Sequence, residues 1–416
     1  MATRRTYTVV ALMALTLVIA LGTGFPIYLR LFFLMVLVMA SSWVWAFLNL
    51  KGVHVTIQRS FGNLQVGDSL ESQVAIHNSS PIPKFGIEIE ELSELPGHTT
   101  GVVVDLPPHK ELRLALKTPL RKRGIYRVGA PIALSGDPFG VFRLRRREAG
   151  SQQLIVLPHT VDIPPFSPAQ GELVGEGVIQ RGSPVSTVSV ATVREYQPGE
   201  SSRHLHWPST ARRGSLMLKQ FDGGLEDMTW ILLDLQGEVH AGEEVENTEE
   251  YAITAAASIA RNYSERGWAV GLLAQGDRLY ALPPLQDAPA LDRLLLALTE
   301  ARSQGSIGLR ELLTLWRSQI ASLAVSLVVV TPSTDPGWSP LLESMMRQGV
   351  STTAVIVDPH SFGGEGDPHL LLSQLDGRGI PTHLLRKGED ISQALQRPWR
   401  FSPGSPIATG TDGAET

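Results

Sequence analysis

The 416-residue sequence contains no cysteine, and only 19% of its residues are charged. Without cysteine there can be no disulfide, no thiolate metal site, no iron–sulfur cluster and no cysteine nucleophile. Basic residues are not in excess, because 36 of them stand against 41 acidic ones and leave a net charge of -5. This balance argues against a general nucleic-acid binder, which needs a basic face. The length predicts roughly two to three domains.

Charge is almost absent from the first fifty residues, where Arg30 is the only charged residue between positions 6 and 50. This apolar stretch is too long for one membrane span of about 20 residues and is right for two. The Gly- and Pro-containing segment 22–26 is typical of a turn between helices. The region 1–50 is therefore predicted to be a short tail and a transmembrane hairpin, with spans at about 6–23 and 27–49.

Basic residues flank this hairpin on one side. Arg4 and Arg5 precede the first span and Lys51 follows the second. The positive-inside rule then predicts a two-span protein of the cell membrane, with both termini and the soluble domains in the cytoplasm. A cleaved signal peptide is the alternative, and it fits less well because a second apolar stretch follows the first directly.

The region 51–165 alternates between apolar and polar residues, as in 53–57, 70–76 and 112–116. Alternation with a period of two, broken by Gly, Pro, Asn and Ser, is typical of half-buried strands. We therefore expect an all-β, immunoglobulin-like sandwich.

Eight basic residues lie in one segment, 121–147, within this β region. They are Arg121, Lys122, Arg123, Arg127, Arg143, Arg145, Arg146 and Arg147. Three interpretations compete: a solvated strand face and hairpin rim, a contact with anionic lipid, or a docking surface for an acidic part of this chain or of a partner. No aromatic stacking platform accompanies the charge, so nucleic acid is not expected.

The region 228–400 alternates between buried strands and helices. An apolar run at 229–233 ends at Asp234, and a helix is expected to begin at Asn247 and end near Gly267. Further strands are predicted at 268–274, 325–331, 353–357 and 380–385, and further helices at 287–302, 308–320, 338–347 and 367–376. This order predicts a doubly wound α/β domain, followed by a disordered tail at 401–416.

The linker 166–227 carries the most distinctive motifs in the chain. It contains Arg-Glu-Tyr, Pro-Gly-Glu, an Arg before a His-Leu-His-Trp run, and Thr-Ala-Arg. The signature residues are Arg194, Glu195, Tyr196, Pro198, Gly199, Arg203, His206, Trp207, Ala211 and Arg212. With Arg-Gly-Ile-Tyr at 123–126 and Asp-Pro-Phe-Gly-Val-Phe at 137–142, these motifs resemble the domain-of-unknown-function 58 family, despite mild departures such as Glu200 and Pro208.

This resemblance implies a membrane-anchored protein whose α/β part is similar to a von Willebrand factor A domain. It also implies a partnership with a MoxR-type AAA+ ATPase in the assembly or activation of other proteins. On physical grounds, the set of Arg194 with Glu195, Arg203 and Trp207 is interpreted as an ion-paired linker clamped on the α/β domain, with an interface role as the alternative. Catalysis by His204 or His206 is not expected, because a lone His beside Arg is not a triad.

The von Willebrand resemblance raises the question of a metal ion. Such domains often bind Mg²⁺ through Asp-x-Ser-x-Ser after the first strand, together with Thr and Asp from later loops, and hard oxygen ligands suit this ion. Here Asp234 is present, but Gln236 and Glu238 occupy the two hydroxyl positions, and Thr331 and Asp335 are only loose counterparts. We therefore expect no metal or other cofactor, with Mg²⁺ at a degenerate Asp234 site as the alternative.

The stretch 223–260 contains nine acidic residues and no basic one. One interpretation is a solvated loop leading into a helix whose amino terminus favours negative charge. The other is a partner-binding rim at the carboxyl edge of the sheet. The candidate rim residues are Glu238, Glu243, Glu244 and Glu246.

Enzyme motifs are missing from the sequence. There is no Gly-x-x-x-x-Gly-Lys-Ser/Thr loop, no Gly-x-Ser-x-Gly and no His-Glu-x-x-His. The chain is therefore predicted to be a non-enzymatic, membrane-anchored adaptor or interaction protein. The alternatives are a metal-dependent adhesion or binding module and an uncharacterised hydrolase.

Overall fold

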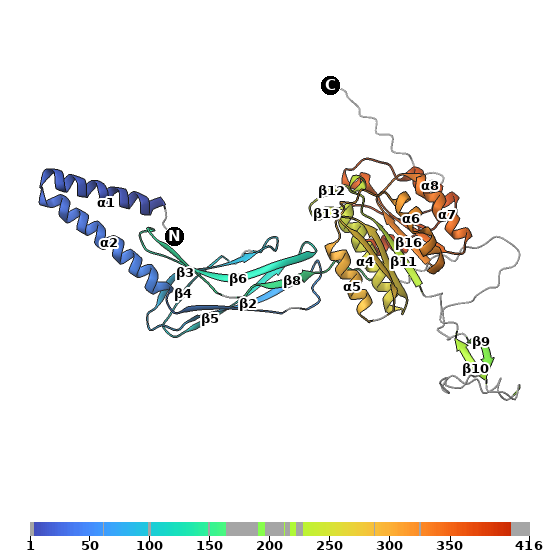
Figure 1. The fold of residues 1–416 in the computed structure, drawn as a ribbon, viewed down its shortest axis with the longest axis horizontal. Coiled ribbons are helices and arrows are strands. Elements are labelled where there is room, and N and C mark those ends of the chain that lie inside the picture. The colour runs from blue at the N-terminus through green and yellow to red at the C-terminus, as the bar shows by residue number, and fades with distance from the viewer. Residues whose placement is uncertain are drawn as a thin grey trace, which may run out of the picture. The chain divides into compact units, whose positions relative to one another are not determined.

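The structure is a computed structural model in which the chain forms two compact units, Met1–Leu157 and Pro158–Thr416 (Figure 1). It describes residues 4–60, 62–98, 101–148, 150–163, 190–195, 212, 217–221, 228–286, 288–323 and 326–400. The division at 157/158 falls eight residues before the boundary expected at 165.

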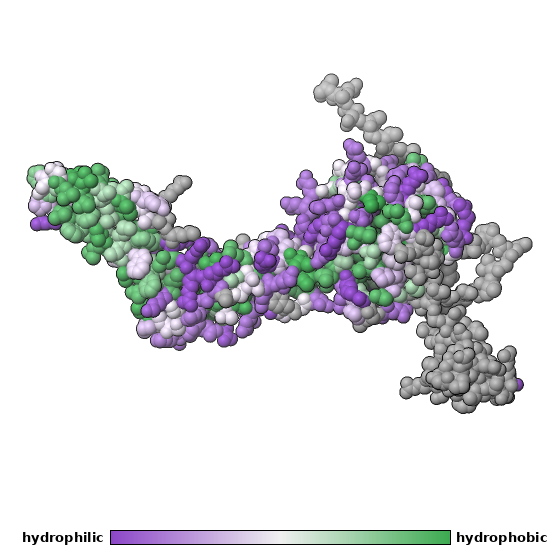
Figure 2. Space-filling view, in the orientation of Figure 1, coloured by the Kyte–Doolittle hydropathy of each residue, from purple (hydrophilic) through white to green (hydrophobic). Residues whose placement is uncertain are grey.

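The first unit begins with two apolar helices, α1 (Arg4–Thr23) and α2 (Pro26–Leu50). Gly24 in the turn between them has a φ of 71°, which favours glycine. Both helices are long and apolar enough to cross a bilayer, and only 17% and 11% of their most apolar windows are buried. A core helix of a soluble protein would be mostly buried, whereas Figure 2 shows the hairpin with an apolar surface. The helices are therefore compatible with membrane anchoring and include the spans expected at 6–23 and 27–49.

Two antiparallel sheets follow in the same unit and form the expected β-sandwich. One sheet has the order β1-β2-β5, and the other has the order β4-β3-β6-β7, with β8 also paired to β6. The strands are β1 (Val53–Arg59), β2 (Ser69–Asn78), β3 (Lys84–Ser93), β4 (Val102–Leu106), β5 (Glu111–Pro119), β6 (Gly124–Gly136), β7 (Arg143–Arg147) and β8 (Gln152–Val156). Val55 and Ile76 from the first sheet share a core with Ile87 and Leu106 from the second. The two sheets therefore pack face to face.

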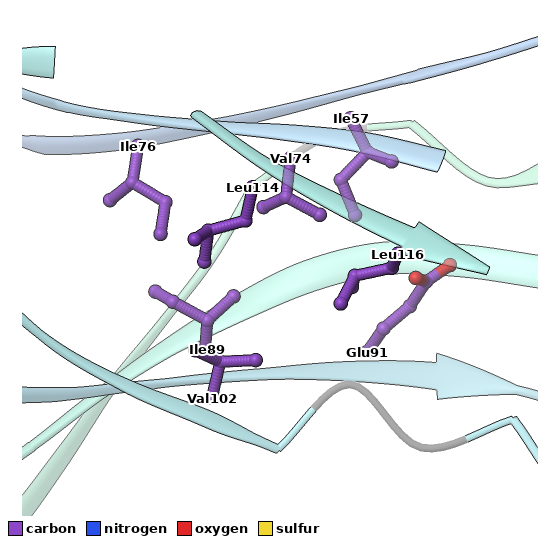
Figure 3. Close-up of a pocket in the computed structure, with 8 residues that line it drawn as sticks. All are labelled: Ile57, Val74, Ile76, Ile89, Glu91, Val102, Leu114 and Leu116. Carbon is purple, nitrogen blue, oxygen red and sulfur yellow. The ribbon is translucent and has the colours of Figure 1, made fainter. Parts of the chain in front are cut away.

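Glu91 is the polar exception in this core. Seven apolar side chains and Glu91 line a cavity of about 10 Å³ between the sheets (Figure 3). The Glu91 carboxylate pairs with the Arg59 guanidinium and lies 3.1 Å from Nε2 of His98, whose Nδ1 is 2.8 Å from Oγ1 of Thr118. Arg123 is also fully buried. This residue therefore does not belong to a solvated basic face, because its side chain is enclosed by the sandwich.

The second unit contains a six-stranded sheet with the order β15-β14-β11-β16-β17-β18. Its strands are β11 (Met228–Asp234), β14 (Ala269–Gln275), β15 (Leu279–Leu285), β16 (Ser326–Thr331), β17 (Ser351–Val357) and β18 (Thr382–Leu385). Neighbouring strands are parallel except for β15, which pairs antiparallel with β14. Every residue of β16 is buried, as expected for a strand covered on both faces.

Helices cover both faces of this sheet (Figure 1). They are α4 (Thr248–Glu265), α5 (Ala288–Glu300), α6 (Leu309–Leu323), α7 (Ser339–Arg347), α8 (His369–Gly377) and α9 (Ile391–Gln396). Leu232 of β11 and Val329 of β16 share one core with residues of α6, α7 and α8. Asn247 caps α4, and its Oδ1 accepts a 2.8 Å hydrogen bond from the Glu250 backbone N–H, which confirms the predicted helix start.

The strand order places a switch point at the carboxyl end of β11. From β11 the chain moves to β14 and β15 on one side, and then to β16, β17 and β18 on the other. Connections leave β11 and β16 on opposite sides, which makes the edge between their carboxyl ends a topological switch point. Ligands of open α/β sheets bind at such points, so this edge is the candidate site.

Candidate functional site

Asp234 and Thr331 meet at the switch point, because β11 and β16 are parallel neighbours that end at the same edge. Oγ1 of Thr331 donates a 2.6 Å hydrogen bond to Oδ2 of Asp234. The backbone N–H of Gln236 donates to Oδ1 at 3.1 Å, and the N–H of Ser333 donates to the Thr331 hydroxyl at 2.9 Å. Both carboxylate oxygens therefore have donors within the protein, and only 2% of the Asp234 surface is exposed.

Burial raises the pKa of the Asp234 carboxyl above its ordinary value. The hydrogen bonds from Thr331 and Gln236 and the nearby His240 act in the opposite direction but are smaller. Desolvation dominates because a carboxylate without water loses its main source of stabilisation. The site consequently favours a neutral carboxyl more than a solvent-exposed aspartate would.

His240 belongs to this site, although no motif or spacing in the sequence singles it out. Its Nε2 lies 3.0 Å from the backbone oxygen of Asp234, and its Nδ1 lies 3.0 Å from Oγ1 of Thr248. Thr248 is the first residue of α4 and is fully buried. The ring therefore connects the end of β11 to the start of α4 and fixes the loop between them.

The acidic stretch leaves this site as an ordered hairpin. After a short 3-10 turn, Gly237–Val239, the chain forms β12 (Gly242–Glu243) and β13 (Glu246–Asn247), which pair antiparallel. Gly242 has a φ of 99°, and a Cβ there would come within 2.6 Å of the Glu246 backbone oxygen. The sequence predicted a solvated loop, and the structure adds a short strand pairing within it, because glycine permits this close approach.

All four predicted rim residues are exposed: Glu238, Glu243, Glu244 and Glu246. Val245 at the tip is 37% exposed and lies between two of these carboxylates. Glu246 is 3.5 Å from Nζ of Lys387, whereas Glu249 turns inward and accepts hydrogen bonds from Ser303. The tip of the hairpin, formed by Glu243, Glu244 and Val245, is hereafter called the acidic tip.

The donor set at Asp234 does not fit a preformed Mg²⁺ site. Mg²⁺ demands oxygen ligands in near-octahedral geometry, but the two Asp234 oxygens already accept protein hydrogen bonds. Gln236 and Glu238 bond each other at 3.2 Å. Within the described ranges no group of three or more His, Cys, Asp or Glu side chains is placed to hold a metal. Oδ1 of Asp335, a loose counterpart of a metal ligand, accepts a 3.0 Å hydrogen bond from the Gly337 N–H within the same turn. That the protein works without a metal stays a prediction.

Most of the family signature lies outside the described residues. Arg194 and Glu195 belong to β9 (Val190–Glu195), which pairs antiparallel with β10 (Met217–Phe221) and places them opposite Leu218 and Met217. Arg212 is exposed. Tyr196, Pro198, Gly199, Arg203, His206, Trp207 and Ala211 are among the residues that the structure does not describe. The ion-paired linker therefore stays a prediction.

An apolar helical hairpin, a β-sandwich and an α/β domain with a mostly parallel sheet define the class of this multidomain chain. The family described as protein of unknown function DUF58 matches residues 192–361. The match covers less than half of the chain, and it confirms the resemblance seen in the motifs. No curated protein matches the chain.

Solved structures resemble parts of the chain only weakly. The CARDB domain of the PF1109 protein from Pyrococcus furiosus is 17% identical, covers 26% of this chain and 90% of its own, and has a TM-score of 0.20. A FixG-related protein from Vibrio parahaemolyticus is 11% identical, covers 26% of this chain and 98% of its own, and has a TM-score of 0.17. At these scores neither structure supports a functional argument.

Proposed function

We propose that this protein is a membrane-anchored, non-enzymatic adaptor that binds a MoxR-type AAA+ ATPase and acts with it in the assembly or activation of other proteins. The observation that carries the proposal is the acidic tip, an ordered hairpin that presents two exposed carboxylates and an apolar side chain. It stands at the sheet edge where α/β domains bind their ligands. The identity of the ATPase rests on the family resemblance.

The anchor in this proposal is the α1–α2 hairpin, which crosses the cell membrane twice. Arg5 and Lys51 lie at the open end of the hairpin, and Arg30 lies near its turn. Greater positive charge at the open end favours its location in the cytoplasm. The soluble units then share a compartment with a cytoplasmic ATPase. A reporter that works only inside the cell should be active when fused to Thr416.

The α/β domain is proposed to be von Willebrand factor A-like. Support comes from the parallel sheet with one antiparallel edge strand and from an Asp and a Thr at the ends of adjacent central strands. Because Asp234 is engaged by Thr331 and Gln236, we infer that binding at this edge uses exposed charge and not a bridging metal.

Exposed carboxylates mainly affect how fast and how selectively partners meet. The acidic tip should therefore attract a basic face of the partner, and binding should weaken as salt screens the charges over a Debye length of about 8–10 Å. Val245 supplies an apolar contact that salt does not screen. The sheet edge would thus contribute both electrostatic attraction and apolar contact to the binding of the partner.

The test is a double charge reversal, Glu243→Lys with Glu244→Lys, measured by association kinetics with the cognate ATPase. A matched control is Asp292→Lys with Asp376→Lys, since both residues are exposed in the same unit and the net charge changes equally. We expect slower association for the tip variant alone, with both variants melting like the wild type. Equal association of the two variants would contradict the proposed surface, and no binding by the wild type would contradict the proposed partner.

A metal-dependent binding module is the second candidate function. It is favoured by the meeting of Asp234 and Thr331 at the switch point, and it requires Mg²⁺ to displace the hydrogen bonds that Asp234 accepts. A Mg²⁺ titration, given in the Discussion, separates the two candidates.

A further inference from the structure

The last turn of α2 is joined to the sandwich by a set of specific hydrogen bonds. Nδ2 of Asn49 donates to the backbone oxygen of Phe85 and to Oγ of Ser135, both at 2.8 Å. Oδ1 of Asn49 accepts from the Phe85 N–H at 3.0 Å. Phe85 lies at the start of β3 and Ser135 near the end of β6. These two positions therefore lie at one end of the sandwich, beside the carboxyl terminus of α2.

Lys84 adds a second connection at the same place. Its ammonium group donates to the backbone oxygen of Leu48 at 2.5 Å, and the residue is only 1% exposed. Burial lowers the pKa of Lys84. A cation against the last carbonyls of a helix is favourable, because these oxygens carry the negative end of the helix dipole. The helix end is thus held by both hydrogen bonding and charge.

The first turn of α1 also contacts this end of the sandwich, at the turn between β6 and β7. Oγ1 of Thr6 donates to the backbone oxygen of Val141, which lies in the turn between β6 and β7. The Arg5 guanidinium packs so closely on Gly140 that a Cβ at position 140 would come within 2.6 Å of Nη1. The β6–β7 turn therefore lies beside the point where the hairpin begins.

Large apolar side chains are exposed at this end of the sandwich. Ile82 is 45% exposed, Phe85 52% and Phe139 60%; these three residues are hereafter the helix-proximal rim. Phe142 of the same turn lines a surface hollow of about 510 Å³ with Trp43 and other α1 and α2 side chains. Exposed apolar side chains of this size can mark an interaction site, and Phe142 places the β6–β7 turn against apolar side chains of the hairpin.

Cations accompany this rim. Arg5 and Lys51 are exposed at the open end of the hairpin, and Arg143 and Arg145 follow the β6–β7 turn. Arg143 pairs with Glu88, whereas Arg145 has no ion pair among the residues that the structure describes. Asp105 also lies here, where it accepts the Gly86 N–H at 2.7 Å. Basic residues next to a membrane strengthen a protein's binding to anionic lipid.

We propose that the helix-proximal rim lies in the interfacial layer of the bilayer that holds the hairpin. Ile82, Phe85 and Phe139 enter the headgroup region, and Arg5, Lys51 and Arg145 contact anionic headgroups. The occupant is the bilayer, because the Asn49, Lys84 and Thr6 contacts hold the rim beside the hairpin's open end. This inference rests on the proposed membrane anchor. In this arrangement the sandwich is held against the membrane surface and does not move freely relative to the hairpin.

The absence of cysteine allows a direct test, since any introduced cysteine is the only site for a spin label. We would label Phe139→Cys and Phe85→Cys in the full chain, reconstituted in vesicles of phosphatidylcholine and phosphatidylglycerol. Leu92→Cys is the matched control, because Leu92 is 56% exposed on β3 but about 23 Å from Phe85 along the strand. Leu15→Cys, exposed on α1, reports the hairpin itself. Unchanged melting of each labelled protein establishes that it is folded.

Collisions with oxygen, which concentrates in lipid, and with a water-soluble nickel chelate then locate each label. We expect labels at 139 and 85 to meet oxygen more often and the chelate several-fold less often than the label at 92. Replacing phosphatidylglycerol by phosphatidylcholine, or Arg145 by Glu, should raise chelate contact at 139.

Each alternative outcome is distinct. If the label at 15 is in lipid but the label at 139 meets the chelate as freely as the label at 92, the rim proposal is wrong and the anchor stands. If the label at 139 is shielded from both reagents, protein covers the rim, which also overturns the proposal. If the label at 15 meets the chelate freely, the membrane anchor itself is wrong.

Discussion

Thr331 at the end of β16 donates a 2.6 Å hydrogen bond to the buried carboxylate of Asp234 at the end of β11, from 97 residues away in the chain. The bond closes the edge of the sheet at the point where a ligand would be expected to bind. Together with the Gln236 N–H, it leaves Asp234 occupied by the protein's own donors. The acidic tip, in contrast, points to solvent beside this closed edge.

The first prediction concerns pH. The pKa of Asp234 is raised above 3.8 in the folded state, so the folded protein keeps a proton that the unfolded chain has already lost. Its contribution to stability is therefore present at low pH and falls as pH rises from about 4 through the folded-state pKa. Asp234→Asn should remove this loss of stability with rising pH, because the asparagine amide does not ionise.

Melting temperatures between about pH 4 and pH 8 measure the effect. The melting temperature of the wild type should decline relative to Asp234→Asn as pH rises. Asp335→Asn is the control, since Asp335 is exposed and should follow the wild type. Parallel profiles for the wild type and Asp234→Asn would show that Asp234 ionises in the folded protein as it does in the unfolded chain.

The second prediction concerns metal. Mg²⁺ should not raise the melting temperature of the protein, because the Asp234 oxygens accept hydrogen bonds from Thr331 and Gln236. Were a site present, Mg²⁺ at a hundred times its dissociation constant would stabilise the protein by about 2.7 kcal/mol. A melting shift that chelator reverses and Asp234→Ala abolishes would instead support the metal-dependent module.

The third prediction concerns the junction of α2 and the sandwich. Asn49→Ala leaves the Phe85 and Ser135 polar groups without their partner, which should weaken this docking by about 1–3 kcal/mol. Trypsin should then cut after Lys51 faster in detergent micelles, because cleavage follows the population of the open state. The control is Ser41→Ala on the same helix, because the exposed Ser41 hydroxyl donates only to the Val38 backbone oxygen of its own helix. Trypsin should cleave this variant as fast as the wild type.

The fourth prediction concerns the buried pair inside the sandwich. Glu91→Gln leaves the Arg59 charge enclosed without a carboxylate, and such a loss typically costs about 3–5 kcal/mol. Urea unfolding of the full chain in micelles should show the sandwich transition at lower denaturant. Glu111→Gln, which breaks the exposed pair with Arg113, should leave the transition where it is.

Local patterns were sufficient to predict much of this fold. The Asn247 cap and the alternation in β2 each depend on a few neighbouring residues, so the sequence shows them directly. Strand β15 was missed because it contains Pro283 and Pro284, which a strand tolerates only at a sheet edge. No local pattern distinguishes such an edge strand from a loop.

Long-range packing accounts for the rest. Residues 252–260 of α4 are all buried, although a helix covered on one side only would bury a single stripe. The extra cover includes the segment 158–163, whose Val161 N–H donates to Ser258 Oγ at 3.0 Å. The position of Asp234 was predictable, but its enclosure by Thr331 and His240 depends on three separate chain segments, which no spacing in the sequence reveals.

The distance along the chain between Asp234 and Thr331 also sets a delay during synthesis. At about 5–20 residues per second, the ribosome reaches Thr331 roughly 5–20 seconds after Asp234. During this interval β11 can pair with β14 but has no neighbour on its other side, and its apolar residues lie along an open edge. The sandwich strands precede β11 and can pair before it is made. The nascent chain is therefore most exposed to aggregation while α5 and α6 are being made.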